Sequence, residues 1–267
     1  LNVSREILQN DSTVESIRTA LTKRVLDMLS KLAKKGGDEY QGFWDEFGTV
    51  LKEGPAEDFS NREKIAGLLR FATTHTGEAT QNVSLDDYIS RMKEGQNKIY
   101  YITGDNFAAA KSSPHLEVFR KKGIEVLLLS DPVDEWMVGY LESYKDVKLV
   151  NAARGELDLG DDEQANNDDP LIQRLSGSLS EHVEAVRATT RLVDSPACLV
   201  LAEDQLGPQM RRMLEAAGQP VPENKPVLEV NLGHDLLAKL SGIDAGERFD
   251  DLAALLLDQA MLAEGQL

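Results

Sequence analysis

A run of acidic residues divides this chain of 267 residues into two parts and so limits the folds that it can adopt. Between Gly155 and Pro170 large apolar side chains are few, and the carboxylates are those of Glu156, Asp158, Asp161, Asp162, Glu163, Asp168 and Asp169. Such a segment cannot bury enough apolar surface to offset the entropy lost on ordering it. Because domains commonly have about 100–150 residues, we predict two domains, residues 1–152 and 171–267, joined by a solvated, mobile acidic linker over residues 153–170.

The first hundred residues have the periodicity of helices. A capping-box pattern, Ser12 followed by Glu15, opens the first one, and Lys34 to Gly37 supplies a basic last turn and a glycine stop. Its apolar positions at helical spacing are Val14, Ile17, Leu21, Val25, Met28 and Leu32. Similar patterns over residues 40–51, 60–69 and 84–95 predict three further helices.

Strand-like segments begin after this helical region. Residues 98–103 and 124–129 are predicted strands, and a predicted helix over residues 113–123 lies between them, which is typical of a βαβ unit. A helix over residues 134–144 and a strand near residues 147–150 would complete a small three-layer α/β/α subdomain.

The second part alternates between strands and helices in no regular order. Strands are predicted near residues 183–192, 197–201 and 227–231, and helices near residues 205–217, 234–240 and from 247 onward. The predicted fold class of the whole chain is therefore α+β: a helical segment plus a small three-layer α/β/α subdomain, followed by a second α+β domain.

Composition excludes several classes of partner. The chain has 46 acidic and 29 basic residues, and its net charge of −17 would repel the phosphates of nucleic acid and of anionic lipid. No apolar run approaches the roughly 20 residues of a membrane-spanning helix. The single cysteine, Cys198, lies in an apolar run that favours a core position, and it cannot form an internal disulfide. We expect a cytoplasmic protein that binds neither nucleic acid nor membrane.

A self-contained enzyme site has little support in the sequence. Gly104 to Ser112 follows a strand, as a phosphate-binding loop does, and Asp131 ends a second strand in the manner of a Walker B motif. A working loop has a second glycine directly before its Lys, however, and Ala110 precedes Lys111 here. The four histidines, His75, His115, His182 and His234, show no metal-ligand spacing, so we expect no metal site.

The first nine residues carry a more specific signal. Arg5 lies between Ser4 and Glu6 in a polar loop, where an arginine is either a surface ion-pair partner or a phosphate ligand. The nonamer resembles the catalytic loop of the ninety-kilodalton heat-shock chaperone family, bacterial type. The resemblance is dense to about residue 150 and looser beyond it, and its further motifs are Ala20–Arg24, Phe43–Trp44, Leu51–Pro55, Leu68–Phe71, Tyr88–Gly95, Ile99–Thr103, Ser113–Pro114, Lys121–Leu127, Leu206–Gln219 and Leu255–Glu264.

The resemblance implies a fragment of an ATP-driven chaperone. Residues 1–152 would finish the family's middle domain, and residues 171–267 would form most of its carboxy-terminal dimerisation domain. The residue matching Arg5 would contact the γ-phosphate, and Gln9 would support the closed arrangement. ATP and Mg²⁺ would be bound mainly by the missing amino-terminal domain, so the parent would be an ATPase and the fragment alone would bind no cofactor and catalyse nothing.

The resemblance also implies a surface for partly folded client proteins. Its residues would be Glu135, Trp136, Leu206, Met210, Met213 and Leu214. By pattern alone, Met and Trp at helical spacing also fit ordinary core packing, although flexible methionine suits a surface with many partners.

The final helix is the expected dimer contact, because its apolar residues cover more than the single stripe that a surface helix needs. The contact residues would be Phe249, Leu252, Leu255, Leu256 and Met261. The parent would be a homodimer that acts on client proteins, with other chaperones as further partners. Two alternatives remain open at this point: a constitutive dimeric scaffold without nucleotide coupling, and a nucleotide hydrolase that uses Lys111 and Asp131.

Overall fold

The structure is a computed structural model that describes residues 12–155, 166–202, 205–221 and 225–265. Its first part opens with the predicted helices. They are α2 (Ser12–Lys35), α3 (Asp38–Leu51), α4 (Gly54–Glu57), the short 3₁₀ helix η1 (Phe59–Asn61), α5 (Arg62–Ala66) and α6 (Leu85–Ser90). Gly36 and Gly37 follow α2 with positive φ, which stops the helix as predicted. Ser84 forms a capping box with Asp87 at the start of α6.

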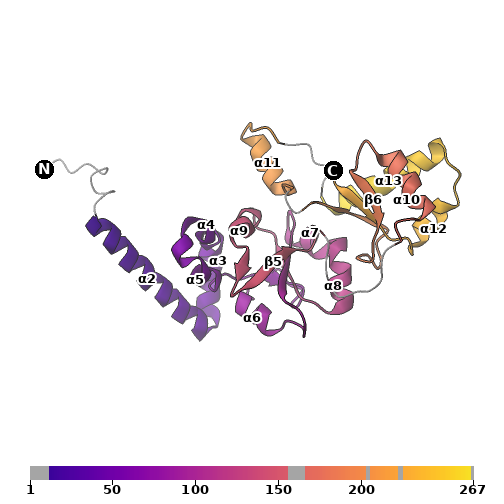
Figure 1. The fold of residues 1–267 in the computed structure, drawn as a ribbon. Coiled ribbons are helices and arrows are strands. Elements are labelled where there is room, and N and C mark those ends of the chain that lie inside the picture. The colour runs from indigo at the N-terminus through magenta and orange to yellow at the C-terminus, as the bar shows by residue number, and fades with distance from the viewer. Residues whose placement is uncertain (1–11, 156–165, 203–204, 222–224, 266–267) are drawn as a thin grey trace.

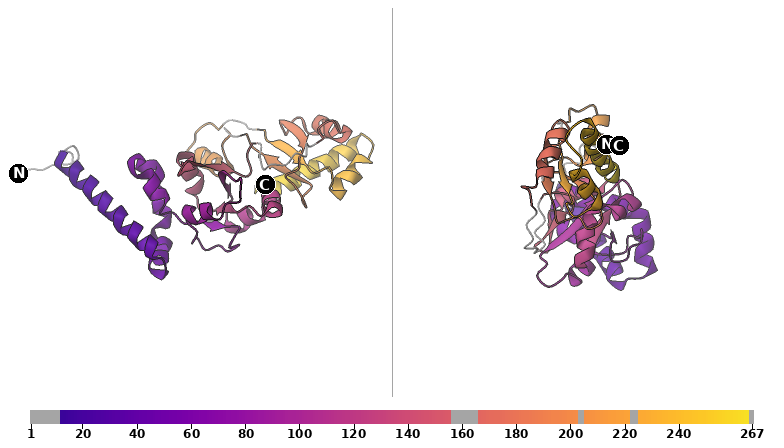
Figure 2. Two further views of the ribbon diagram at one scale, coloured as in Figure 1. Left: turned by 60° about the horizontal axis from the view of Figure 1, so that its bottom comes forward. Right: turned by 90° about the vertical axis from the view of Figure 1, so that its right-hand side faces the viewer.

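The buried face of helix α2 is not the one that the sequence predicted. Leu26 and Leu29 are buried, whereas Ile17, Leu21 and Met28 of the predicted apolar stripe are exposed. Figure 2 shows the reason: α2 extends from one end of the elongated molecule and meets the other described elements only near its C-terminal end.

The α/β subdomain follows, and its elements confirm the predicted strands. They are β1 (Ala72–Thr73), β2 (Lys98–Thr103), α7 (Phe107–Ser112), η2 (Pro114–Leu116), α8 (Glu117–Lys122), β3 (Val126–Leu129), α9 (Asp134–Tyr140), β4 (Ser143–Tyr144) and β5 (Val147–Asn151). The sheet order is β1-β3-β2-β5-β4. Strand β2 runs parallel to β3 and β5, and the two short edge strands are antiparallel to their neighbours. The predicted βαβ unit is therefore present.

Alternating side chains place two hydrophobic layers on this sheet, as strand geometry requires. Ile99 and Leu127 face the cluster shared with α3, α5 and α9. Tyr100, Ile102 and Leu128 face the opposite cluster, which is covered by α7 and α8. The subdomain thus has the predicted three layers.

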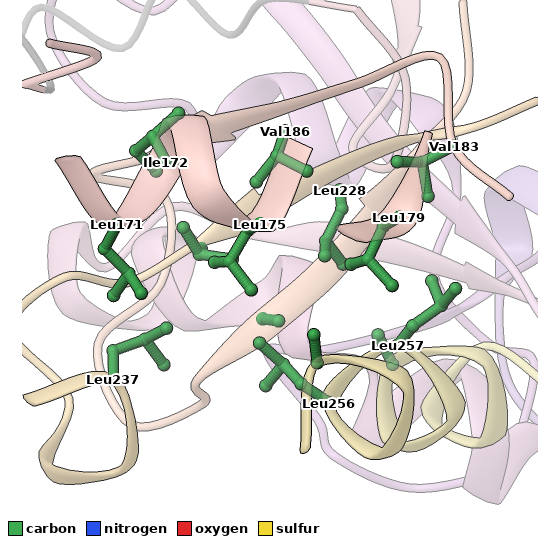
Figure 3. Close-up of a cluster of buried hydrophobic side chains, with 14 of the residues drawn as sticks. Leu171, Ile172, Leu175, Leu179, Val183, Val186, Leu228, Leu237, Leu256 and Leu257 are labelled. Carbon is green, nitrogen blue, oxygen red and sulfur yellow. The ribbon is translucent and has the colours of Figure 1, made fainter. Parts of the chain in front are cut away.

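The second part has its own core. Its elements are α10 (Pro170–Leu179), β6 (Ala185–Ala188), β7 (Ala197–Val200), α11 (Pro208–Ala216), β8 (Val227–Val230), α12 (Asp235–Ser241) and α13 (Glu247–Ala263). The sheet order is β6-β8-β7, with β6 parallel and β7 antiparallel to β8. Figure 3 shows α10 and α13 packing Leu175, Leu179 and Leu256 around β8.

Helix α10 was not predicted, although its start carries a recognisable signal. Asp169 caps the helix through the backbone N–H of Leu171, and Pro170 occupies the first turn, where a missing N–H costs nothing. The α+β fold class is confirmed, with mixed sheets and many helices in both parts.

Candidate functional site

Two of the predicted site residues, Arg5 and Gln9, lie outside the described residues. The remaining ones lie on three helices, α9, α11 and α13, except Leu206, which lies just before α11.

Helix α9 turns one side to the core and the other outward. Asp134 and Met137 are buried, whereas Trp136 is half-buried and its ring meets the edge of the Tyr140 ring at a centroid distance of 5.2 Å. Trp136 is therefore accessible in part and does not belong to the hydrophobic cores formed by the described residues.

Helix α11 belongs to the second part of the sequence but lies over α9 of the first part (Figure 1). Met213 is 65% exposed, and Leu206, Met210 and Leu214 are half-buried. None of these four side chains enters a hydrophobic core of the described residues. The structure thus brings Trp136 and the α11 residues onto neighbouring helices, as a shared surface requires.

Glu135 connects the two helices. Its Oε2 accepts a hydrogen bond from the backbone N–H of Met210 at 2.8 Å, and its Oε1 lies 3.5 Å from Nη2 of Arg154. Beside this contact, a groove runs along α9 and β5 with Tyr101, Val138 and Leu149 among its lining residues.

The two parts of the chain meet at a polar joint that includes Glu117 of α8. Its Oε2 accepts hydrogen bonds from the backbone N–H groups of Val193, Asp194 and Ser195 at 2.6, 2.8 and 3.2 Å. Burial alone would raise the pKa of Glu117, but these bonds and one from the Ser195 hydroxyl outweigh it and hold the pKa below its ordinary value.

Arg191 completes the joint from the side of the second domain. It donates to the carbonyl oxygens of Ala152 and Gly155 at 2.9 and 2.7 Å, and its Nε lies 3.2 Å from Oε2 of Glu229. The buried His115 lies beside it, with Nε2 3.0 Å from the carbonyl oxygen of Leu199 and 3.1 Å from Oε1 of Glu264. A buried, hydrogen-bonded charge such as that of Arg191 fixes one arrangement of two elements.

Helix α13 places the predicted dimer residues in three environments. Phe249 and Leu256 are buried in the core of their own domain, and Leu252 and Met261 are packed against it. Leu255 is 60% exposed, and so is a residue outside the predicted set, Leu262, at 63%. Of the predicted dimer residues, Leu255 is the most exposed in the described structure, and it shares its face of α13 with Leu262.

The hydrolase alternative has no assembled site. Lys111 donates to the carbonyl oxygen of Gly77 at 2.7 Å, and Asp131 pairs with Lys52 at 2.7 Å, so the two predicted residues are not brought together. A Cβ on Gly104 would lie 2.7 Å from the backbone nitrogen of Ala110, which indicates that this glycine serves close packing. In the described part of the chain, three or more metal-ligating side chains do not cluster, and the helices there are too short or too polar to cross a membrane.

Sequence reasoning did not identify Glu117 and Arg191 as joint residues or Glu135 as a contact of α11. Their partners in these contacts lie 36 to 78 positions away along the chain, so local periodicity cannot predict the contacts.

Comparison with known proteins places these observations in a family. The family model described as Hsp90 protein matches residues 1–266. Chaperone protein HtpG of Alcanivorax borkumensis is 72% identical over 268 residues, which is 100% of this chain and 43% of that protein. Chaperone protein HtpG of Shewanella amazonensis is 56% identical over 274 residues, covering 99% of this chain and 43% of that protein. The chain therefore spans less than half the length of these curated relatives, and it belongs to the Hsp90 protein family.

Proposed function

We propose that this chain is part of an ATP-dependent molecular chaperone that acts as a cytoplasmic homodimer on partly folded client proteins. The chain supplies a client-binding surface, dimer contacts and an arginine that assists ATP hydrolysis. It holds no nucleotide itself, because ATP and Mg²⁺ are bound mainly by a domain that this chain does not include.

The observation that carries the proposal is the surface formed by α9 and α11. Met213 is largely exposed and Trp136, Met210 and Leu214 are half-buried on two helices in contact. An exposed apolar surface in a chain with a net charge of −17 stays soluble while it offers apolar contacts to an unfolded chain. Methionine adapts its shape to many partners, which suits clients without a common sequence.

The proposed role of Arg5 rests on the family and on the chemistry of the guanidinium group. This group stays charged and grips phosphate oxygens through two parallel hydrogen bonds. Placed at a γ-phosphate, it stabilises the charge that develops during phosphoryl transfer.

Nucleotide dependence tests the proposal against the constitutive scaffold. The full-length parent is mixed with a chemically unfolded model protein, and light scattering is followed with ATP, with ADP and without nucleotide. The proposal predicts suppression of aggregation that changes with the nucleotide. Client binding that is the same in all three conditions would favour the scaffold instead.

A further inference from the structure

Helix α11 makes polar contacts with the first part of the chain. The described core clusters include none of its residues, although it belongs to the second part of the sequence. Individual polar contacts therefore contribute to its position on α9.

The main bond is made by Glu135. Its side chain is only 8% exposed, and its carboxylate receives the N–H of Met210 in the first turn of α11. The first backbone N–H groups of a helix have no partner within the helix, and a carboxylate there also meets the positive end of the helix dipole. Gly207, the residue at the N-cap position, has no side chain to fill this role.

Gly207 shows how closely the two elements approach. Its φ of −73° and ψ of 165° are open to any residue, so its backbone does not require glycine. A Cβ at this position, however, would lie 1.4 Å from Oε1 of Glu135. Any side chain here would therefore have to displace the Glu135 carboxylate, whereas the backbone conformation would accept it.

A second polar pair supports the same placement. Arg212 on α11 donates to Oδ2 of Asp105, in the loop after β2, at 3.0 Å. Both side chains are about half exposed, so this pair adds little free energy by itself. Glu135 is the buried one of the two anchors.

We propose that Glu135 is the positioning residue that docks α11 on α9, and that it thereby sets how Met213 and Leu214 are presented. The part concerning presentation rests on the proposed function, whereas the docking does not. Release of Glu135 frees α11 to move away from α9.

Hydrogen exchange of the backbone amides of α11 tests the docking in the full-length parent. We expect Glu135→Ala to speed exchange in α11 by at least about tenfold, because the helix loses its anchor. Glu135→Gln keeps an acceptor oxygen but not the charge, and should give an intermediate rate. Glu142→Gln is the matched control, since Glu142 lies exposed beside the same groove and should leave the rate unchanged.

Gly207→Ala supplies a second, independent variant. It should speed exchange in α11 as Glu135→Ala does, and the double variant should be no faster than Glu135→Ala alone, because the added methyl group then has no carboxylate to meet. Unchanged exchange in Glu135→Ala, or additive effects in the double variant, would overturn the docking assignment.

A measurement of client affinity on the same variants distinguishes this inference from the proposed function. Affinity for a labelled unfolded protein should fall in Glu135→Ala in parallel with the loss of docking. Faster exchange in α11 with unchanged client affinity would leave the docking standing and refute the role of α11 in client binding.

Discussion

Lys52 is a buried cation that ties the helical region to the α/β subdomain. It is 1% exposed, and its Nζ lies 2.7 Å from Oδ2 of Asp131 and 2.7 Å from Oδ1 of Asp134. Burial raises the pKa of Asp134, whereas Lys52 lowers the pKa of Asp131 although burial opposes this shift. Removing the cation would leave two carboxylates close together in a dry site.

Lys52→Ala should therefore destabilise the first domain by about 3–5 kcal/mol, the usual effect of breaking a buried ion pair. Urea unfolding followed by circular dichroism measures this change. The control is Lys145→Ala, which removes the exposed pair with Asp86 and should lower the free energy of unfolding by less than about 1 kcal/mol. Similar effects of the two substitutions would contradict the structural role of Lys52.

Glu117 makes a pH-dependent contribution to the free energy of unfolding through its bonds at the joint. Because its pKa is lower in the folded than in the unfolded chain, its contribution is complete above the ordinary value of 4.5 and is lost as the pH falls through the folded pKa. Glu117→Gln should remove this contribution. We expect the wild-type chain to lose stability more steeply than the variant below about pH 4.5. Parallel pH profiles in urea unfolding would show that the Glu117 bonds do not form in solution.

For individual residues, the sequence predicts contacts between near neighbours and not between residues that are distant along the chain. The helix start at Ser84 was predicted from local pattern, and its capping partner Asp87 lies only three residues away. The bonds of Lys52 to Asp131 and of Glu117 to Ser195 span 79 and 78 positions. Only the assembled fold brings those partners together.

The helices were predicted more securely than the faces that they bury. Periodicity located α2 and α13, because apolar residues at helical spacing are a strong signal. In α2, however, Leu26 and Leu29 are buried although they lie outside the predicted stripe. Both faces of such a helix carry apolar residues, so the pattern cannot say which one meets the core.

Helix α13 likewise has one buried and one exposed apolar face, and the exposed face yields a test of the proposed dimer. Leu255 and Leu262 lie seven residues apart on the exposed face of the helix, whereas Leu256 is in the core. We expect Leu255→Asp with Leu262→Asp to turn the parent dimer into a monomer without loss of helical structure. Leu256→Asp should instead unfold the second domain, since it buries a charge.

Sedimentation velocity and circular dichroism distinguish these outcomes. A double variant that remains a dimer at the same concentration would exclude this face of α13 as the interface.

At the scale of the whole molecule, composition predicted a division into two domains but not the contacts between the two parts of the chain. Helix α11 belongs to the second part by sequence and lies on the first in space (Figure 1). The client surface proposed for Trp136 and Met210 is thus shared between the two parts of the chain, which the sequence alone associated only through the family resemblance. Glu135, which the sequence also assigned to this surface, is instead a buried contact of α11.

In the proposed function, Arg5 links the chain to the ATPase reaction of the parent. Arg5→Ala should lower ATP turnover by at least about tenfold with little change in melting temperature, since an arginine that contacts the γ-phosphate is worth about 10³ in other phosphoryl-transfer systems. Steady-state ATPase assays and thermal unfolding of the same preparation measure both effects. Unchanged turnover would exclude Arg5 from the reaction.

The central claim is that the surface of α9 and α11 binds unfolded protein, and fluorescence anisotropy of a labelled, permanently unfolded client tests it most directly. The decisive variant is Met213→Ser with Leu214→Asn, and the control is Leu236→Ser, which changes an exposed leucine on α12. We predict that the α11 variant binds the client at least about tenfold more weakly, since losing two apolar contacts costs more than about 1.4 kcal/mol. The control should bind as the wild type does. Equal affinity of all three proteins, with intact folds, would contradict the account.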